Sequence, residues 1–160
     1  MKLLRTINRL KDPRDLWLFL QILFTLIALP RKISRQSLPG LLAGLDPGVA
    51  PVPHDRKKME KTAGFIDSLL KYRPFQRYGH CLLRSLVLFK FLRRQGWPVS
   101  IHFGVKKTGE AQEGRPATAP AGAPERIDIT GHSWLVFEGQ PFLETEAQEG
   151  AFAETYHYPR

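Results

Sequence analysis

The hydrophobic period of the chain changes at Gly96, and this change limits the fold class more than any other feature. Before Gly96, apolar residues recur every three or four positions over 55–72 and again over 81–95, which is typical of amphipathic helices. After Gly96, apolar residues alternate with polar or small ones, at Val99, Ile101, Phe103 and Val105. This alternation predicts a strand with one buried face. Helices followed by strands indicate an α+β fold, in which a helix packs on one face of a small antiparallel sheet.

Two further strands are predicted near the C-terminus. Residues 132–137 and 142–145 are rich in apolar and aromatic side chains, and the turn-forming residues 138–141 separate them, so the pair predicts a hairpin. Residues 108–126 combine Gly, Pro, Ala and charge without any period, and they predict a long mobile loop.

The N-terminal third holds an apolar segment, residues 16–29, interrupted only by Gln21 and Thr25. Its fourteen residues fall short of the roughly 20 needed to span a bilayer, and no small-residue cleavage site follows. Two interpretations stay open: a buried helix of the domain, and an interfacial anchor or docking helix. Because residues 38–53 are dense in Pro and Gly, we expect 1–54 to form an apolar helix and a linker, and 55–160 the main domain.

The net charge of +9 is unevenly spread. Residues 1–107 carry 21 Lys and Arg against 6 Asp and Glu, whereas residues 108–160 carry 3 against 9. The densest basic cluster has no interleaved aromatic residues, so it predicts a solvated helix face and no nucleic-acid partner; its members are Arg56, Lys57, Lys58 and Lys61. An anionic membrane surface or an acidic peptide partner for this cluster stays open. A single cysteine argues for a reducing compartment. We therefore expect a cytoplasmic protein, with peripheral contact of 16–29 with the inner membrane face as an open alternative.

Cys81 is the candidate nucleophile. It stands at the start of the predicted helix, where unpaired backbone N–H groups and the helix dipole favour a thiolate. A lone intracellular cysteine is more often a small buried apolar side chain, so its position alone does not establish catalysis.

His132 and Glu144 supply the groups that such a nucleophile needs. A thiol requires a base, and the base requires an acceptor on its far ring nitrogen. The hairpin turn allows His132 and Glu144, twelve residues apart, to lie side by side on the sheet face covered by the Cys81 helix. The backbone N–H of Cys81 is the natural oxyanion donor, with Gln76 or Tyr78 as side-chain candidates. No Cys-x-x-Cys or His-Glu-x-x-His motif is present, so we expect no metal and no cofactor.

Five stretches of the chain together resemble one protein family. They are Cys-Leu-Leu-Arg-Ser-Leu at 81–86, the run from Phe91 to Val99 with Leu-Arg-Arg-Gln-Gly, Ile-His-Phe-Gly-Val at 101–105, Gly-His-Ser-Trp-Leu at 131–135 and Pro-Phe-Leu-Glu at 141–144. These residues resemble the transglutaminase-like cysteine-protease domain of lasso-peptide maturation B-proteins. The resemblance covers about residues 55–145, and segment 16–29 is similar to the N-terminal region of those proteins.

The resemblance implies a papain-like or transglutaminase-like fold with Cys81 as nucleophile, His132 as base and Glu144 as its orienting acid. It also implies removal of the leader from a ribosomally made precursor peptide. The implied partners are that precursor, a small leader-recognition protein and an ATP-dependent cyclase. The family usually has aspartate at the third position, whereas this chain has Glu144, one methylene longer. Two alternatives stay open: an acyltransferase that uses the same triad, and a non-catalytic peptide-binding module.

Overall fold

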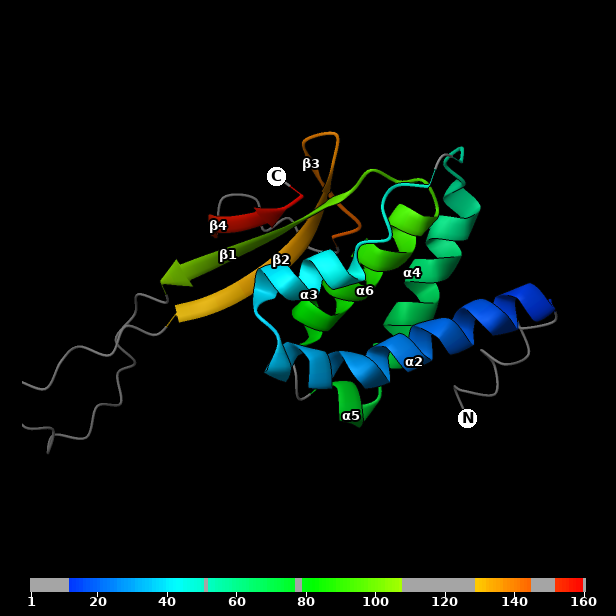
Figure 1. Cartoon of the computed structure of the whole chain (residues 1–160), viewed down its shortest axis with the longest axis horizontal. Helices are drawn as coiled ribbons and strands as arrows, with labels where there is room; N and C mark the ends of the chain where they lie inside the picture. The colour runs from blue at the N-terminus through cyan, green and yellow to red at the C-terminus, as the bar shows by residue number, and fades with distance from the viewer. Residues whose placement is uncertain (1–11, 51, 77–78, 108–128, 145–151, 160) are drawn as a thin grey trace, which may run out of the picture.

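The computed structural model describes residues 12–50, 52–76, 79–107, 129–144 and 152–159. Its elements follow in the order α2 (Pro13–Arg35), α3 (Leu38–Leu45), α4 (Arg56–Leu70), α5 (Arg73–Gln76), α6 (His80–Arg94), β1 (Ser100–Lys107), β2 (Ile129–Phe137), β3 (Gln140–Phe142) and β4 (Ala153–Tyr158). The helices form one layer and the strands another, with α6 between the sheet and the remaining long helices (Figure 1). The predicted α+β class is confirmed.

The described strands form one antiparallel sheet in the order β3-β2-β1-β4. The predicted hairpin joins β2 to β3 through a two-residue turn, in which Glu138 and Gly139 have φ values of 51° and 78°. Two positive φ values match the right-handed twist of the flanking strands. Because the turn uses only these two residues, β3 begins earlier than predicted, and it ends at Phe142, so Leu143 and Glu144 of the predicted strand 142–145 lie outside it. Strand β4, which pairs with the free edge of β1, was not predicted.

The two faces of the sheet differ in their environment. Ile101, Ser133 and Leu135 are buried on the inner face, and Tyr158 on the same face contacts the ring of Phe89 in α6 at 5.8 Å. The alternate positions form the outer face, where a row of rings comprises His102, Trp134 and His157. Strand alternation therefore separates a core face under α6 from an aromatic outer face.

Helix α6 is the central helix of the core. Its buried side chains include Leu86, Phe89 and Leu92, none of which is exposed to solvent. The helix ends where predicted, because Gly96 adopts a φ of 86° that side-chain-bearing residues rarely reach. A Cβ at that position would collide with the Val52 backbone, so the glycine also permits close approach of the preceding loop.

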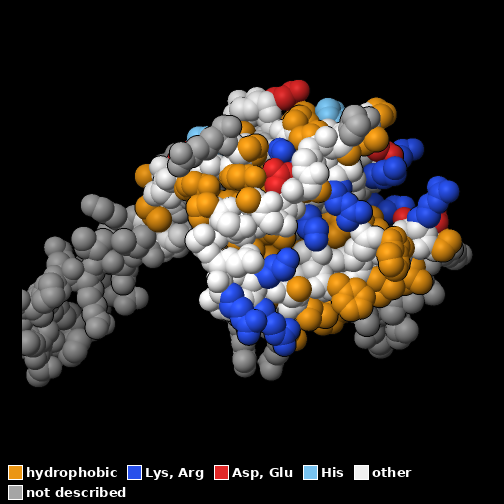
Figure 2. Space-filling view, in the orientation of Figure 1, with side chains coloured by type: hydrophobic (Ala, Val, Ile, Leu, Met, Phe, Trp, Pro, Cys, Tyr) orange, Lys and Arg blue, Asp and Glu red, His pale blue; other side chains and the backbone are white. Residues whose placement is uncertain are grey.

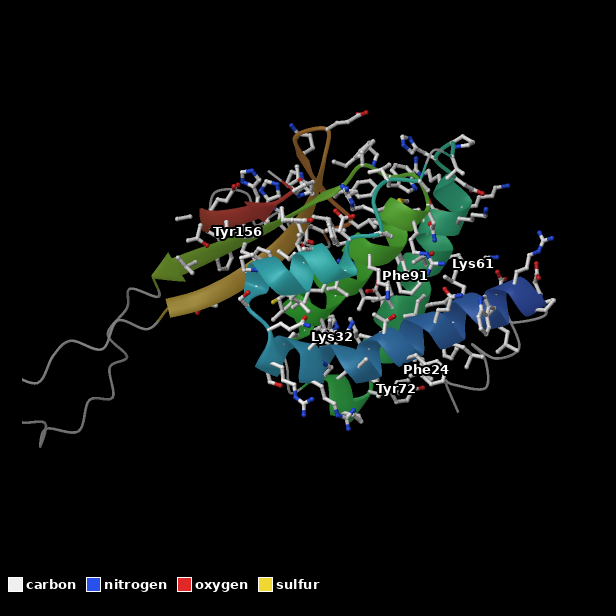
Figure 3. The ribbon with its side chains drawn as sticks, viewed as in Figure 1. Phe24, Lys32, Lys61, Tyr72, Phe91 and Tyr156 are labelled. Carbon is white, nitrogen blue, oxygen red and sulfur yellow. The ribbon has the colours of Figure 1, made fainter. Side chains whose placement is uncertain are left out.

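Helix α4 begins after Asp55, whose side chain accepts a hydrogen bond from the backbone N–H of Lys58. The basic cluster predicted for this helix is exposed along its length. Arg56 pairs with Glu60, and Lys61 reaches Asp15 at the start of α2 at 2.7 Å, in agreement with its position in Figure 3. The cluster is thus a solvated helix face, as predicted.

The predicted loop over 38–53 contains a helix instead, α3. Pro39 lies in its first turn, where a missing N–H costs no hydrogen bond. Leu41, Leu42 and Leu45 are buried against the core, so tertiary burial outweighs the low helix propensity of the glycines. The residues of the predicted loop 108–126 lie outside the described part of the chain.

Helix α2 is longer than the apolar segment that predicted it. It has 23 residues and continues through Pro30, with Asp12 as its N-cap. By length and composition it could cross a membrane, and 22% of its apolar window is buried within the molecule. Ile22, Leu26 and Leu29 form the buried stripe that packs on the core.

Candidate active site

Cys81 lies in the first turn of α6 and is partly exposed. Gly79 is the N-cap, with a φ of 78° and no side chain to accept from the first-turn amides. The first turn therefore keeps backbone N–H groups, that of Cys81 among them, available to an incoming anion. Tyr78 and the Gln76 side chain, the other predicted oxyanion donors, lie outside the described residues.

Two side chains just after Cys81 fix the position of α6. The Ser85 hydroxyl donates to the Ser133 carbonyl of β2 at 2.8 Å, in a buried hydrogen bond. The Arg84 guanidinium donates to Asp67 of α4, also at 2.8 Å. Since both residues follow Cys81 by about one helical turn, they hold the start of α6, with Cys81, between the sheet and α4.

Glu144 connects the histidine to the cysteine helix. Its Oε2 atom lies 3.6 Å from His132 Nε2, and its Oε1 atom lies 3.8 Å from Arg84 Nη1. Leu143 adopts a φ of 61°, which turns the chain at the end of β3 just before Glu144. The predicted juxtaposition of His132 and Glu144 is therefore present at ion-pair distance. A carboxylate on Nε2 leaves Nδ1 as the ring nitrogen that could exchange a proton with a thiol.

The structure corrects the predicted face of His132. Ser133 and Leu135 occupy the inner-face positions of β2, and His132 belongs to the alternate set. Its ring stacks on Trp134 with 5.9 Å between centroids and lies 5.1 Å from that of Phe152. Glu144, which follows the end of β3, lies at ion-pair distance from both this imidazole and Arg84 of α6. The length of the hairpin alone does not fix which residues of β2 point toward α6, and in the structure these are Ser133 and Leu135.

The three predicted residues are brought together only in part. His132 meets Glu144, and Glu144 meets the helix of Cys81 through Arg84. Among the described residues, no hydrogen bond reaches the Cys81 sulfur, from His132 or from any other group. Catalytic contacts are often long in substrate-free enzymes and tighten in the substrate complex.

Phe152 is a site residue that sequence reasoning missed. It precedes β4, and its ring packs against the ring of His132 on β2, although strand β1 lies between these two strands in the sheet. The detectable signal was the run of β-prone residues Thr155 to Tyr158, which predicts a strand and brings Phe152 with it. Together, Trp134 and Phe152 restrict the orientation of the imidazole.

The arrangement suits acyl transfer. A thiol at a helix N-terminus can attack a carbonyl, the helix amides can stabilise the oxyanion, and an imidazole held by a carboxylate can move the protons. The groups that such chemistry needs come from three separate parts of the chain, namely α6, β2 and the residues just after β3.

A family model described as the transglutaminase-like superfamily matches residues 23–157. No curated protein and no solved structure matches the chain. The matched range runs from the middle of α2 to β4 and contains Cys81, His132 and Glu144. The chain therefore belongs to the transglutaminase-like superfamily, whose fold is of the cysteine-protease and acyltransferase type.

Proposed function

We propose that this protein is a cysteine peptidase that removes the leader from a ribosomally made precursor peptide, as in lasso-peptide maturation. The observation that carries the proposal is the position of Glu144, which lies between His132 and Arg84 of the cysteine helix. This placement supports an acid–base pair, His132 and Glu144, that is linked through Arg84 to the helix carrying Cys81. The resemblance of residues 81–86 and 131–144 to lasso-peptide B-proteins supports the choice of substrate.

The proposed reaction has two steps. The Cys81 thiolate attacks the peptide carbonyl, and the N–H of Cys81 stabilises the oxyanion. His132 donates its proton to the leaving amine, which leaves a thioester on Cys81. His132 then takes a proton from water, and the resulting hydroxide releases the leader as a carboxylate. Glu144 stabilises the imidazolium form throughout.

Product masses test the reaction class. Incubation with the precursor is expected to give two fragments whose masses together equal the precursor plus one water. If a primary amine is added and the acyl fragment carries that amine instead of water, the protein is an acyltransferase with the same triad. A precursor that is bound but unchanged in mass would favour the non-catalytic peptide-binding module and contradict the peptidase proposal.

We further propose that α2 lies on an anionic membrane surface, which would place this cytoplasmic enzyme at the inner face of the membrane. The stripe opposite its buried one exposes large apolar side chains, with Trp17 65% and Phe24 68% exposed. In Figure 2, hydrophobic side chains gather over this helix, and lysines and arginines gather near its C-terminal end. Exposed apolar stripes flanked by cations are typical of interfacial helices.

A groove beside this stripe supports the same proposal. Residues of α2, α3 and α6 line it, namely Phe24, Thr25, Ala28, Leu29, Lys32, Leu45 and Lys90. Burial, and then the nearby charges of Lys32 and Arg94, lower the pKa of Lys90. A groove lined by both apolar side chains and lysines fits an anionic amphiphile such as a phospholipid. Phe24 and Lys32 are labelled on α2 in Figure 3.

Vesicle binding tests the α2 proposal. The double variant Trp17→Ala, Phe24→Ala is expected to bind vesicles containing phosphatidylglycerol at least about tenfold more weakly, since each aromatic side chain contributes roughly 1.5 kcal/mol or more when buried. Co-sedimentation measures the bound fraction, and Val105→Ala, at an exposed apolar position of β1, is the matched control. Equal binding by wild type and double variant would exclude the membrane. That result would instead favour α2 as a binding surface for the leader-recognition protein or for the precursor. We propose these two partners whether or not α2 binds the membrane.

A further inference from the structure

A cluster of metal-ligating side chains lies on the outer face of the sheet, on strands β1 and β4. His102 Nδ1 lies 2.8 Å from Glu154 Oε2, and His157 Nδ1 lies 2.8 Å from Glu154 Oε1. One donor atom from each residue lies within 4.8 Å of the other two. Two imidazole nitrogens and a carboxylate therefore form a compact group of possible metal ligands.

An irregularity of β4 creates this arrangement. His157 pairs with His102 and Glu154 pairs with Gly104, while Thr155 is an extra residue without a partner position on β1. In a regular strand, residues three apart point to opposite faces, so the bulge is what places Glu154 and His157 on the same face. The Thr155 hydroxyl donates to the Phe103 carbonyl at 3.2 Å and fastens the bulge to β1.

The surroundings of His102 are those of a metal ligand. Its second ring nitrogen, Nε2, lies 2.9 Å from the Ser100 hydroxyl, which itself lies 3.5 Å from the Val136 carbonyl. Ligating histidines usually have such a partner on the other nitrogen, because it fixes the tautomer and the ring orientation. The His102 side chain is only 15% exposed, so its ring has little freedom to turn away.

The charge of the cluster also suits a cation. Glu154 supplies the carboxylate of the cluster, and each of its two oxygens faces an imidazole nitrogen at 2.8 Å. Glu154 and His157 are 44% and 46% exposed, which leaves room for water as the remaining ligand. Two imidazoles with one carboxylate form a donor set preferred by zinc and its neighbours, whereas magnesium and calcium prefer oxygen ligands alone.

We propose that His102, Glu154 and His157 form a binding site for a divalent transition-metal ion, with zinc as the expected occupant. The ion binds the Nδ1 atoms of two neutral imidazoles and displaces their protons to Nε2. On His102, the Nε2 proton is donated to Ser100, and the Ser100 hydroxyl turns toward the Val136 carbonyl. On His157, whose side chain is half-exposed, the Nε2 proton faces solvent. The ion joins β4 to β1, and it thereby stabilises the strand next to Phe152, which packs on His132.

Cobalt binding to the untagged, full-length chain tests the proposal. After treatment with a chelator, wild type is expected to bind one Co²⁺ with visible absorption but without the near-ultraviolet band of a cobalt–thiolate bond. His157→Ala, at an exposed position, is expected to weaken binding at least about tenfold, and Ser100→Ala to weaken it less. His54→Ala is the matched control, because that ring stacks on Trp97 away from the cluster.

A metal ion that joins β4 to β1 should also stabilise the folded protein against thermal unfolding. One equivalent of Zn²⁺ is expected to raise the melting temperature of wild type and of Cys81→Ala, and not that of His157→Ala. Cobalt affinity that is the same in wild type and His157→Ala would overturn the site. Binding that is lost in Cys81→Ala, or that carries a thiolate band, would place the ion on Cys81 and would overturn it as well.

Discussion

Replacing Cys81 with alanine is expected to abolish precursor cleavage and to leave the fold unchanged. The sulfur is the only group on α6 that can form the thioester, so its loss should lower the cleavage rate by at least about 10⁴-fold. Cys81 is partly exposed and makes no hydrogen bond within the described structure, so the free energy of unfolding should change by less than about 1 kcal/mol. Cleavage is measured under single-turnover conditions, and stability by thermal unfolding of both proteins.

The serine variant sharpens this test. Cys81→Ser keeps the size and polarity of the side chain, but its hydroxyl is a far weaker nucleophile, so it should also be inactive. Substantial cleavage by Cys81→Ala would exclude covalent catalysis at this residue, whatever the serine variant does. A cleavage defect accompanied by a large fall in melting temperature would instead give Cys81 a structural role.

The order of helices and strands could be predicted because it follows local periodicity. The period of three and four over α4 and α6 requires only that one face be apolar, and the two-residue turn at Glu138-Gly139 is a local signal. Helix α3 could not be predicted in this way. Its formation depends on Leu41, Leu42 and Leu45 finding the core, which is a tertiary effect that local propensity does not contain.

The candidate site was predictable to the same extent. The approach of His132 to Glu144 follows from the hairpin, which is local. The position of the His132 ring depends on Trp134 and on Phe152. Phe152 comes from the segment before β4, which pairs with the edge of β1 opposite to β2. The contact of Glu144 with Arg84 depends on how α6 crosses the sheet. The His132–Phe152 and Glu144–Arg84 contacts cannot be predicted from sequence spacing. Each joins two elements whose relative position depends on how the core packs.

On the outer face of the sheet, the rings of His132, Trp134 and His102 form one continuous row. The ring of Trp134 lies 5.9 Å from that of His132 and 6.0 Å from that of His102. Trp134 is therefore the residue between the proposed base and the proposed metal site. A shift of β4 would move Phe152, which packs on His132, and Glu154, which contacts His102. Strand β4, which was not predicted from the sequence, therefore supports both sites.

Replacing His132 with alanine is expected to slow both precursor cleavage and alkylation of Cys81. Without the imidazole no group of the described site can hold the thiol proton, so cleavage should fall nearly as far as in Cys81→Ala. Wild type should react with iodoacetamide faster than free cysteine at neutral pH, and His132→Ala no faster than free cysteine. Intact-mass analysis after brief exposure counts the single label, because Cys81 is the one cysteine of the chain.

Matched controls separate the role of the base from general damage. His54→Ala removes a different ring and Glu138→Gln a carboxylate of the exposed hairpin turn, and both should label at the wild-type rate. Glu144→Gln should lose less activity than His132→Ala, because the amide keeps a polar group next to the imidazole but no longer stabilises the imidazolium. Equal labelling of wild type and His132→Ala would show that the imidazole does not activate the thiol. Since the two residues share no hydrogen bond in the substrate-free structure, that result would mean that Cys81 and His132 do not act as a pair before the substrate binds.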